Sequence, residues 1–167
     1  EIIKKNNSKN GYLCGLSKNQ LSKVNFQESH RIFYIPNGLD TNIVKPVKNP
    51  KRNYLAYLGR LNYEKGIDLA VKIALETGEK LKIAGLIRSS EKDSIKLFNE
   101  KVKPYLGKNI EFIGQINDEE KSIFLGNAKA LLMPNRWNEP FGLVMAEALS
   151  AGTPVIGTNK GSIPEII

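Results

Sequence analysis

Short apolar runs alternate with amphipathic stretches along most of the chain. Each run ends at or beside glycine or proline; the runs lie at 54–59, 81–84, 110–113, 130–133 and 154–157. The stretches between them have helical periodicity and predict helices at 66–77, 90–105, 118–126 and about 140–151. This alternation predicts an α/β fold, a Rossmann-like parallel sheet with helices on both faces, whose ligands bind beyond the carboxyl ends of the strands.

Turn and cap residues refine these bounds. Ser90 is expected to cap its helix, Asn117 with Glu120 has the form of a capping box, and so has Ser162 with Glu165. Upstream, the pattern predicts a strand at 12–16, a helix at 18–24 and a strand at 31–35. A turn signal at 37–38 and two prolines before residue 53 then indicate a linker between domains.

The stretch after the run at 130–133 is the strongest candidate for chemistry. Pro140 favours a helix start, which would leave the N–H groups of residues 141–143 free, and Gly152 favours the helix end. Glu139 and Glu147 would then lie at most roughly 12 Å apart along the helix axis. A diphosphate suits the N-terminus between them, and each carboxylate suits hydroxyl groups. A nucleotide sugar presents a sugar, a diphosphate and a ribose in that order.

Two cations follow the first strand of the predicted sheet. Arg60 comes directly after Gly59, and Lys65 precedes Gly66 at the start of the next helix. A guanidinium grips phosphate oxygens with two parallel hydrogen bonds, and an ammonium adds a compact charge. Taken alone, either the cations or the glutamates could be ordinary surface charges, but their combination favours a diphosphate site.

Residues 139–147 resemble the E-x7-E signature of retaining glycosyltransferase family 4, the glycosyl transferases group 1, which have the two-domain GT-B fold. The resemblance extends to 35–40, 57–66 and 161–167. It implies that 1–45 is a remnant of an N-terminal acceptor domain with its hinge, and that 46–167 is the donor-binding domain, truncated at its C-terminus. The 167 residues are too few for both domains, so the chain is expected to be a fragment that transfers nothing by itself.

The resemblance also implies a role for each site residue. Arg60 and Lys65 contact the donor diphosphate, Glu139 lies against the donor sugar, and Glu147 holds the ribose hydroxyls. The remaining implied donor contacts are the backbone of Gly142, Leu143 and Val144, the turn at Gly59, and, as weaker base contacts, Gly114 and Gln115.

The implied reaction is hexosyl transfer from a nucleotide sugar to a sugar, a lipid-linked or another hydroxyl acceptor, with retention at the anomeric carbon. The nucleotide sugar is a substrate, and no cofactor is expected. Cys14 and His30 are single residues of their kinds and no Asp-x-Asp motif occurs, so no metal site is expected.

Composition restricts the partners. The formal charge is +8, but the lysines are spread along the chain, so nucleic-acid binding is not expected. No apolar run approaches membrane-spanning length, and a cytoplasmic location is expected, with peripheral contact at the inner membrane surface left open.

Four other functions share part of the pattern. A glycoside hydrolase also uses two carboxylates, about 5 to 9.5 Å apart, but needs no phosphate clamp. A dinucleotide-dependent oxidoreductase would need a Gly-x-Gly-x-x-Gly turn where this chain has residues 59–61. A nucleotide-sugar epimerase of similar architecture and a nucleotide-sugar-binding module without transferase activity stay open as alternatives.

Overall fold

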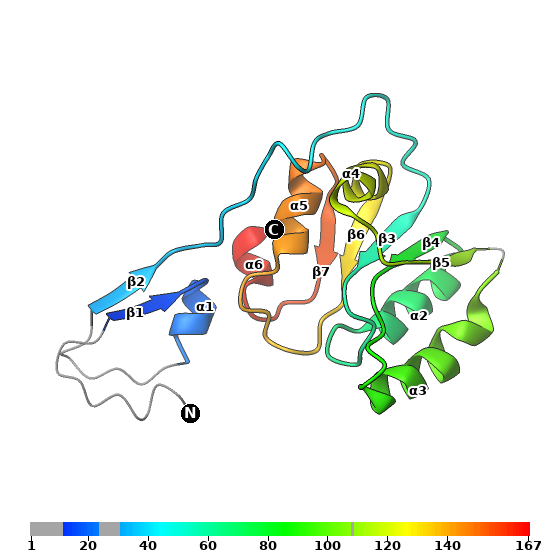
Figure 1. Cartoon of the computed structure of the whole chain (residues 1–167), viewed down its shortest axis with the longest axis horizontal. Helices are drawn as coiled ribbons and strands as arrows, with labels where there is room; N and C mark the ends of the chain where they lie inside the picture. Colours follow the sequence, from blue (N-terminus) through cyan, green and yellow to red (C-terminus); the bar gives the residue numbers. More distant parts are fainter. Residues whose placement is uncertain (1–11, 24–30, 108) are drawn as a thin grey trace.

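A computed structural model describes residues 12–23, 31–107 and 109–167 (Figure 1). Its main body is a five-stranded sheet in the order β5-β4-β3-β6-β7, in which every neighbouring pair is parallel. The strands are β3 (Leu55–Leu58), β4 (Leu81–Ala84), β5 (Ile110–Gly114), β6 (Ala130–Met133) and β7 (Val155–Gly157). The predicted α/β fold with a parallel sheet is therefore confirmed.

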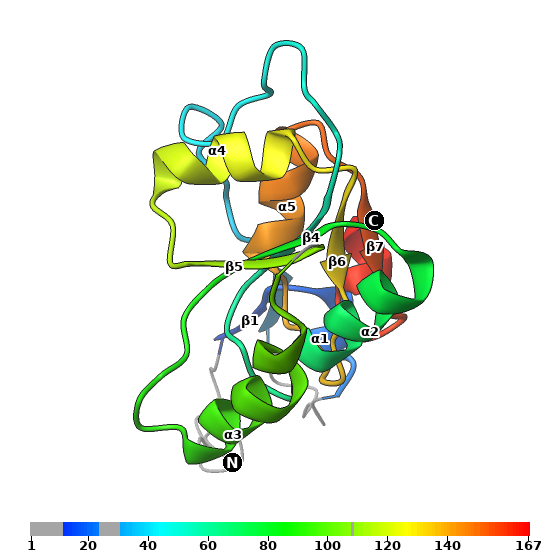
Figure 2. The ribbon, with the colours of Figure 1, turned by 90° about the vertical axis from the view of Figure 1, so that its right-hand side faces the viewer.

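Helices cover both faces of this sheet (Figure 2). They are α2 (Ile67–Thr77), α3 (Lys92–Lys101), α4 (Asp118–Gly126), α5 (Leu143–Ser150) and α6 (Ile163–Ile166), with a short 3₁₀ turn at Lys103–Tyr105. Side chains alternate across β3, so that Leu55 and Tyr57 pack in a core cluster with α2, whereas Ala56 packs in a second cluster with α4 and α5. Burial on both faces explains why the strands are short, nearly continuous apolar runs.

The strand order reverses at β3. After β3 the chain moves outward through β4 and β5, and then returns to the other side of β3 to form β6 and β7. The loops that leave the carboxyl ends of β3 and β6 therefore diverge to opposite faces of the sheet. Such a switch point is where open parallel sheets bind ligands.

A separate two-stranded sheet precedes the main body (Figure 1). It consists of the parallel strands β1 (Tyr12–Gly15) and β2 (Arg31–Tyr34), with α1 (Lys18–Leu21) between them. The helix predicted at 18–24 is shorter, because it ends at Leu21 with Ser22 as its C-cap; residue 24 lies outside the described residues. At α1, the carboxylate of Glu165 from the main body accepts hydrogen bonds from the backbone N–H groups of Lys18 at 2.9 Å and Asn19 at 2.7 Å.

The linker packs onto the main body before residue 46. Val44 is 1% exposed and belongs to the core cluster under α4 and α5. Its carbonyl accepts a hydrogen bond from Ser150 Oγ at 2.8 Å, and the carbonyl of Ile43 accepts one from Ser122 Oγ at 2.9 Å. A domain division between 45 and 46 stays a prediction.

The start of α5 differs from the expectation. The helix begins at Leu143, and Pro140 lies outside it. Phe141 is buried, and its carbonyl accepts a hydrogen bond from Ser162 Oγ at 2.7 Å, so the chain is fixed in a non-helical path until Gly142 turns it at φ 83°. The helix end is as predicted, because Gly152 at φ 76° closes it.

Two other caps also differ. The helix predicted from Ser90 has Glu91 at its N-cap and ends at Lys101, because Pro104 cannot continue it and a 3₁₀ turn follows. Ser162 does not form a capping box, since its hydroxyl binds Phe141 and the carboxylate of Glu165 binds α1. The capping box of Asn117 with Glu120 is present as predicted.

Candidate functional site

Glu139 lies at the switch point, on the loop after β6. The residue is 7% exposed, and one oxygen of its carboxylate, Oε2, accepts three hydrogen bonds. The donors are Lys65 Nζ at 2.5 Å, Asn135 Nδ2 at 2.8 Å and Trp137 Nε1 at 3.2 Å. The other oxygen, Oε1, accepts nothing from the described residues, and no buried side-chain oxygen among them lacks a partner. Oε1 is therefore the atom of Glu139 open to a ligand.

Lys65 joins the two loops of the switch point. It precedes α2, and its ammonium binds Glu139 and lies 5.0 Å from the centre of the Trp137 ring. An ammonium over an aromatic face is attracted by the ring quadrupole. A lysine has three donor hydrogens, so this ammonium keeps the capacity to bind a further anion.

A second ion pair connects the loop after β6 to α2. Arg136 binds Asp68 of α2 through two parallel hydrogen bonds of 2.7 Å, and it lies 4.0 Å from the centre of the Tyr63 ring. Burial raises the pKa of the Asp68 carboxyl, but the hydrogen bonds and charge of Arg136 outweigh burial and hold that pKa below its ordinary value of 3.8. The pair therefore ties the loop that carries Glu139 to the helix that follows Lys65.

The N-terminus of α5 offers backbone donors beside Glu139. The N–H groups of Gly142, Leu143 and Val144 have no acceptor among the described residues, as expected for the first turn of a helix. No side chain caps this end. The free donors predicted from the sequence are therefore present, although the helix begins later than expected.

Glu147 lies one turn further along α5 and is held in the same manner as Glu139. Its Oε1 accepts a hydrogen bond from Lys121 of α4 at 2.8 Å, and Lys121 also binds Asp118 at 3.0 Å. Burial lowers the pKa of the Lys121 ammonium, but its hydrogen bonds to Glu147 and Asp118 outweigh burial and raise the pKa above 10.5. Glu147 Oε2 accepts nothing from the described residues and stays available.

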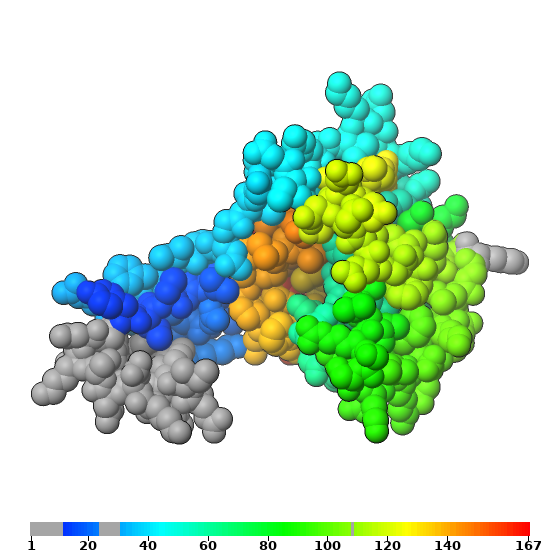
Figure 3. Space-filling view, viewed as in Figure 1, coloured from blue at the N-terminus to red at the C-terminus, as the bar shows by residue number. Residues whose placement is uncertain are grey.

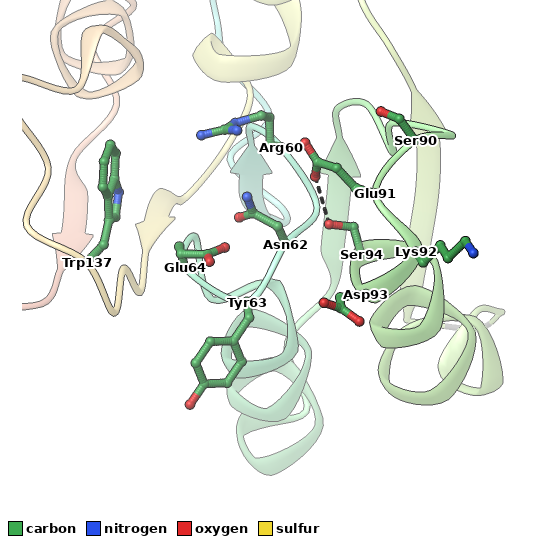
Figure 4. A pocket seen from close by; sticks show the side chains of 10 residues that line it. All are labelled: Arg60, Asn62, Tyr63, Glu64, Ser90, Glu91, Lys92, Asp93, Ser94 and Trp137. Carbon is green, nitrogen blue, oxygen red and sulfur yellow. Dashed lines mark hydrogen bonds between the residues drawn. The ribbon is translucent and has the colours of Figure 1, made fainter.

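Arg60 lies apart from these pairs, on the wall of an open cavity of about 910 Å³. The cavity lies between the loop at 60–64, residues 90–94 at the start of α3, and Trp137 (Figure 4). Arg60 is exposed and its guanidinium makes no hydrogen bond or ion pair within the described residues. In the space-filling view, the surface of α5 lies between the N-terminal segment and α3 (Figure 3).

The remaining predicted donor contacts follow or end strands of the sheet. Gly59 follows β3 and donates its N–H to the carbonyl of Ala84 at 3.1 Å. Gly114 ends the edge strand β5, and Gln115 is exposed in the connection to α4, the helix that carries Lys121. Both residues therefore precede α4, whose Lys121 binds Glu147.

The sequence did not predict a role in the site for Asn135, Trp137 and Lys121, or for the ion pair of Arg136 with Asp68. Asn135 and Trp137 lie within four residues of Glu139, so their proximity to it was the available signal. Lys121 and Glu147 are 26 residues apart, and Arg136 and Asp68 are 68 apart, so only the fold brings them together.

Residues 40–167 match the family described as Glycosyl transferases group 1. The chain belongs to this family. A glycogen synthase from Mycobacterium tuberculosis is 34% identical over 118 residues, which are 68% of this chain and 27% of that protein. The chain spans between 27% and 38% of the length of the first curated relatives that it matches.

Two solved structures share the fold. AviGT4, a glycosyltransferase involved in avilamycin A biosynthesis, superposes with a TM-score of 0.76 at 27% identity, covering 92% of this chain and 46% of that one. Sucrose-phosphate synthase from Thermosynechococcus elongatus gives 0.79 at 25%, covering 91% and 41%. The main body of this member of the family is thus Rossmann-like, as in GT-B enzymes. Among its described residues, no helix is long and apolar enough to cross a membrane.

Proposed function

We propose that this chain is the donor-binding part of a glycosyltransferase that moves a sugar from a nucleotide sugar to a hydroxyl acceptor. One observation carries the proposal. Glu139 and Glu147 lie on either side of the uncapped N-terminus of α5, and a lysine holds one oxygen of each while the other oxygen stays available. Carboxylate oxygens accept hydrogen bonds from sugar hydroxyls, and free backbone N–H groups bind phosphate oxygens.

The donor fits this arrangement in one direction. Glu139 Oε1 faces the transferred sugar, the N–H groups of Gly142, Leu143 and Val144 bind the diphosphate, and Glu147 Oε2 accepts the ribose hydroxyls. Lys65 adds an ammonium beside the diphosphate, and Arg60, which has no partner among the described residues, adds a guanidinium from the cavity wall. Family membership and the glycogen synthase relative support this assignment.

The reaction is proposed to retain the anomeric configuration. The bond between the anomeric carbon and the diphosphate oxygen breaks, and that oxygen leaves with the electron pair. The acceptor oxygen then bonds to the same face of the sugar, and its proton passes to the departing phosphate. Negative charge develops on the phosphate, where Arg60, Lys65 and the α5 backbone stabilise it, and one preorganised donor of this kind contributes about 10²-fold or more.

Nucleotide binding tests the proposal. The melting temperature of the chain is measured with UDP, GDP and ADP at one common concentration, and a nucleotide present at about 100 times its dissociation constant adds about 2.7 kcal/mol. We expect one nucleotide to raise the melting temperature by roughly 5 to 10 °C. Arg60→Ala and Glu147→Ala should abolish most of this rise, because they remove a diphosphate and a ribose contact.

Lys129→Ala provides the matched control, since Lys129 pairs with Glu79 away from the site. This variant should keep the full rise. Three nucleotides without effect on the parent chain, or an equal rise in Arg60→Ala and Glu147→Ala, would contradict the proposed donor site.

The alternative of a nucleotide-sugar-binding module without transferase activity predicts the same nucleotide binding. The two functions separate in the longer protein, where a transferase releases nucleoside diphosphate only when a hydroxyl acceptor is present. A nucleotide-sugar epimerase would instead convert the sugar without an acceptor.

A further inference from the structure

The cavity beside Arg60 adjoins the proposed donor path and shares Arg60 with it, but it extends in another direction. Its walls are the loop at 60–64, the start of α3 at 90–94, and Trp137. Glu139, Glu147 and residues 142–144 of α5 do not line it. Trp137 separates the two, because its indole N–H binds Glu139 while its side chain forms the opposite wall of the cavity from α3 (Figure 4).

The charges of the lining do not suit a second phosphate group. Arg60 and Lys92 bring two positive charges, whereas Glu64, Glu91 and Asp93 bring three negative charges. Glu64 and Asp93 are exposed and have no ion pair among the described residues. A second diphosphate would meet more negative than positive charge, so the lining favours a neutral ligand rich in hydroxyl groups.

The polar groups of the lining offer both donors and acceptors. Asn62 uses its amide oxygen to accept the N–H of Lys65 at 3.0 Å, which leaves its Nδ2 without a partner among the described residues. Ser94 Oγ binds Glu91 Oε2 at 2.8 Å, as Figure 4 shows, so Glu91 Oε1 keeps only a 3.6 Å ion pair with Arg88. Each sugar hydroxyl both donates and accepts, and this mixture of amide and carboxylate groups matches that need.

Two aromatic side chains complete the lining. Tyr63 is 60% exposed, and Trp137 is half-buried. Both are held in place, Tyr63 by the guanidinium of Arg136 over its ring and Trp137 by Glu139 and Lys65. Large, fixed rings provide apolar contact area at low cost in conformational entropy, which suits the C–H face of a pyranose.

We propose that this cavity is a carbohydrate subsite on the donor-binding domain itself, and that it takes a neutral sugar ring of the acceptor. The inference rests on the proposed function for the adjacent donor site. The transferred sugar belongs against Glu139, on the other side of Trp137, so a ring in the cavity is a second ring next to the reacting one. Part of the acceptor is thus recognised by this chain, through contacts with Glu64, Asp93 and Trp137.

Trp137 is the only tryptophan of the sequence, so its fluorescence reports on this wall directly. The chain is titrated with methyl α-D-glucoside, methyl α-D-mannoside, N-acetylglucosamine and maltotriose. A single ring of about 12 heavy atoms is expected to bind with a dissociation constant of about 1 mM. We expect a saturable fluorescence change with at least one of these sugars.

The variant Glu64→Gln/Asp93→Asn keeps the shape of the lining and Trp137 but weakens two hydrogen-bond acceptors. It should bind the same sugar about tenfold more weakly. The control Glu119→Gln changes an exposed carboxylate on α4, outside the cavity lining, and should bind as the parent does.

Repeating the titration with a nucleotide sugar present distinguishes the sources of the ring. An acceptor ring binds together with the nucleotide sugar, whereas displacement by it would assign the cavity to the donor and overturn the inference. No saturable change with any sugar, or identical titrations of the parent and Glu64→Gln/Asp93→Asn, would also overturn it. These results leave the nucleotide-induced rise in melting temperature intact, so they are distinguishable from a failure of the proposed donor site.

Discussion

The carboxylate of Glu139 shows how a buried charge can be both stabilised and kept available. Three donors converge on Oε2, which satisfies the charge of a side chain that is 7% exposed. Oε1 is left to the ligand. Glu147 repeats the arrangement with a single lysine. At the residue scale, then, each carboxylate is oriented by one oxygen, and the other oxygen can recognise a hydroxyl group.

The ion pair of Asp68 with Arg136 should make the stability of the chain depend on acid pH. The pKa of Asp68 is lower in the folded chain than its ordinary value of 3.8, so the folded state favours the charged carboxylate. Its contribution is therefore fully present above about pH 5 and is lost as the pH falls below about 4, through the lowered pKa. An exposed or half-buried pair of this kind is worth about 1 kcal/mol.

Urea unfolding of the parent and of Asp68→Asn between pH 3 and pH 7 measures this contribution. The parent should be more stable by about 1 kcal/mol at neutral pH, and the difference should shrink toward pH 3. The control Asp93→Asn removes an exposed carboxylate that has no ion pair among the described residues, and it should show a smaller difference. A gap between parent and Asp68→Asn that does not change with pH would contradict the prediction.

At the scale of elements, the site depends on how closely α2 approaches the loop after β6. Gly66 begins α2 with φ 71°, and a Cβ atom there would overlap the backbone carbonyl of Pro134. The N–H of Arg136 also binds the carbonyl of Glu64 at 2.8 Å. These contacts set Lys65 and Glu139 side by side, so the two elements form one unit.

Gly66→Ala should therefore be strongly destabilising. The left-handed conformation costs a non-glycine residue roughly 1–2 kcal/mol, and the overlap with Pro134 adds about 1–3 kcal/mol. Gly78→Ala is the matched control, because Gly78 has φ 68° but no atom near its would-be Cβ. Chemical denaturation should show a loss that is larger for Gly66→Ala by at least about 1 kcal/mol. Equal losses in the two variants would refute a role for the close approach.

The sequence predicted the elements well because their signals are local. Apolar runs that end at or beside glycine or proline defined β3 to β6, and Asn117 with Glu120 defined the start of α4. The start of α5 was predicted wrongly because the preference of Pro140 for a first helical turn is weaker than the burial of Phe141 and its hydrogen bond from Ser162. That hydrogen bond joins residues 21 positions apart, so the residues near Pro140 contain no signal that predicts it.

At the scale of the whole molecule, the site residues were predicted as a set, but their partners were not. Lys65 and Glu139 follow the neighbouring parallel strands β3 and β6, so both lie at the carboxyl edge of the sheet. Their proximity could be predicted, because ligands of a parallel sheet bind at that edge. The pairing of Glu147 with Lys121 depends on how α4 packs on α5, and that of Arg136 with Asp68 depends on the rotation of α2. Both ion pairs depend on packing between segments that are distant in the sequence. No local pattern in a single sequence predicts such packing.

The two sheets of the molecule are connected through Glu165. Its carboxylate accepts the N–H groups of Lys18 and Asn19 at the start of α1. Glu165→Ala should therefore loosen α1 while leaving the five-stranded sheet unchanged, because it removes about 1 kcal/mol of charge-assisted hydrogen bonding at an exposed position.

Hydrogen exchange measures this effect residue by residue. The amides of Lys18 and Asn19 should exchange about fivefold faster in Glu165→Ala, and those of β3 and β6 should not change. Glu119→Ala, at an exposed carboxylate of α4, should leave all of these rates as in the parent. Unchanged exchange at Lys18 and Asn19 would show that Glu165 does not hold α1.

The ion pairs of Lys65 with Glu139 and of Lys121 with Glu147 mean that the site carries its own counterions. Each carboxylate of the proposed donor site is already neutralised by a neighbour, so two of the cations near the diphosphate path are occupied before a donor arrives. An incoming diphosphate adds two or more negative charges, and only Arg60 and the backbone of α5 meet it without a prior partner among the described residues. Donor binding then adds an anion to an ammonium that keeps Glu139 as its partner, and the dependence of donor binding on ionic strength should arise mainly from Arg60.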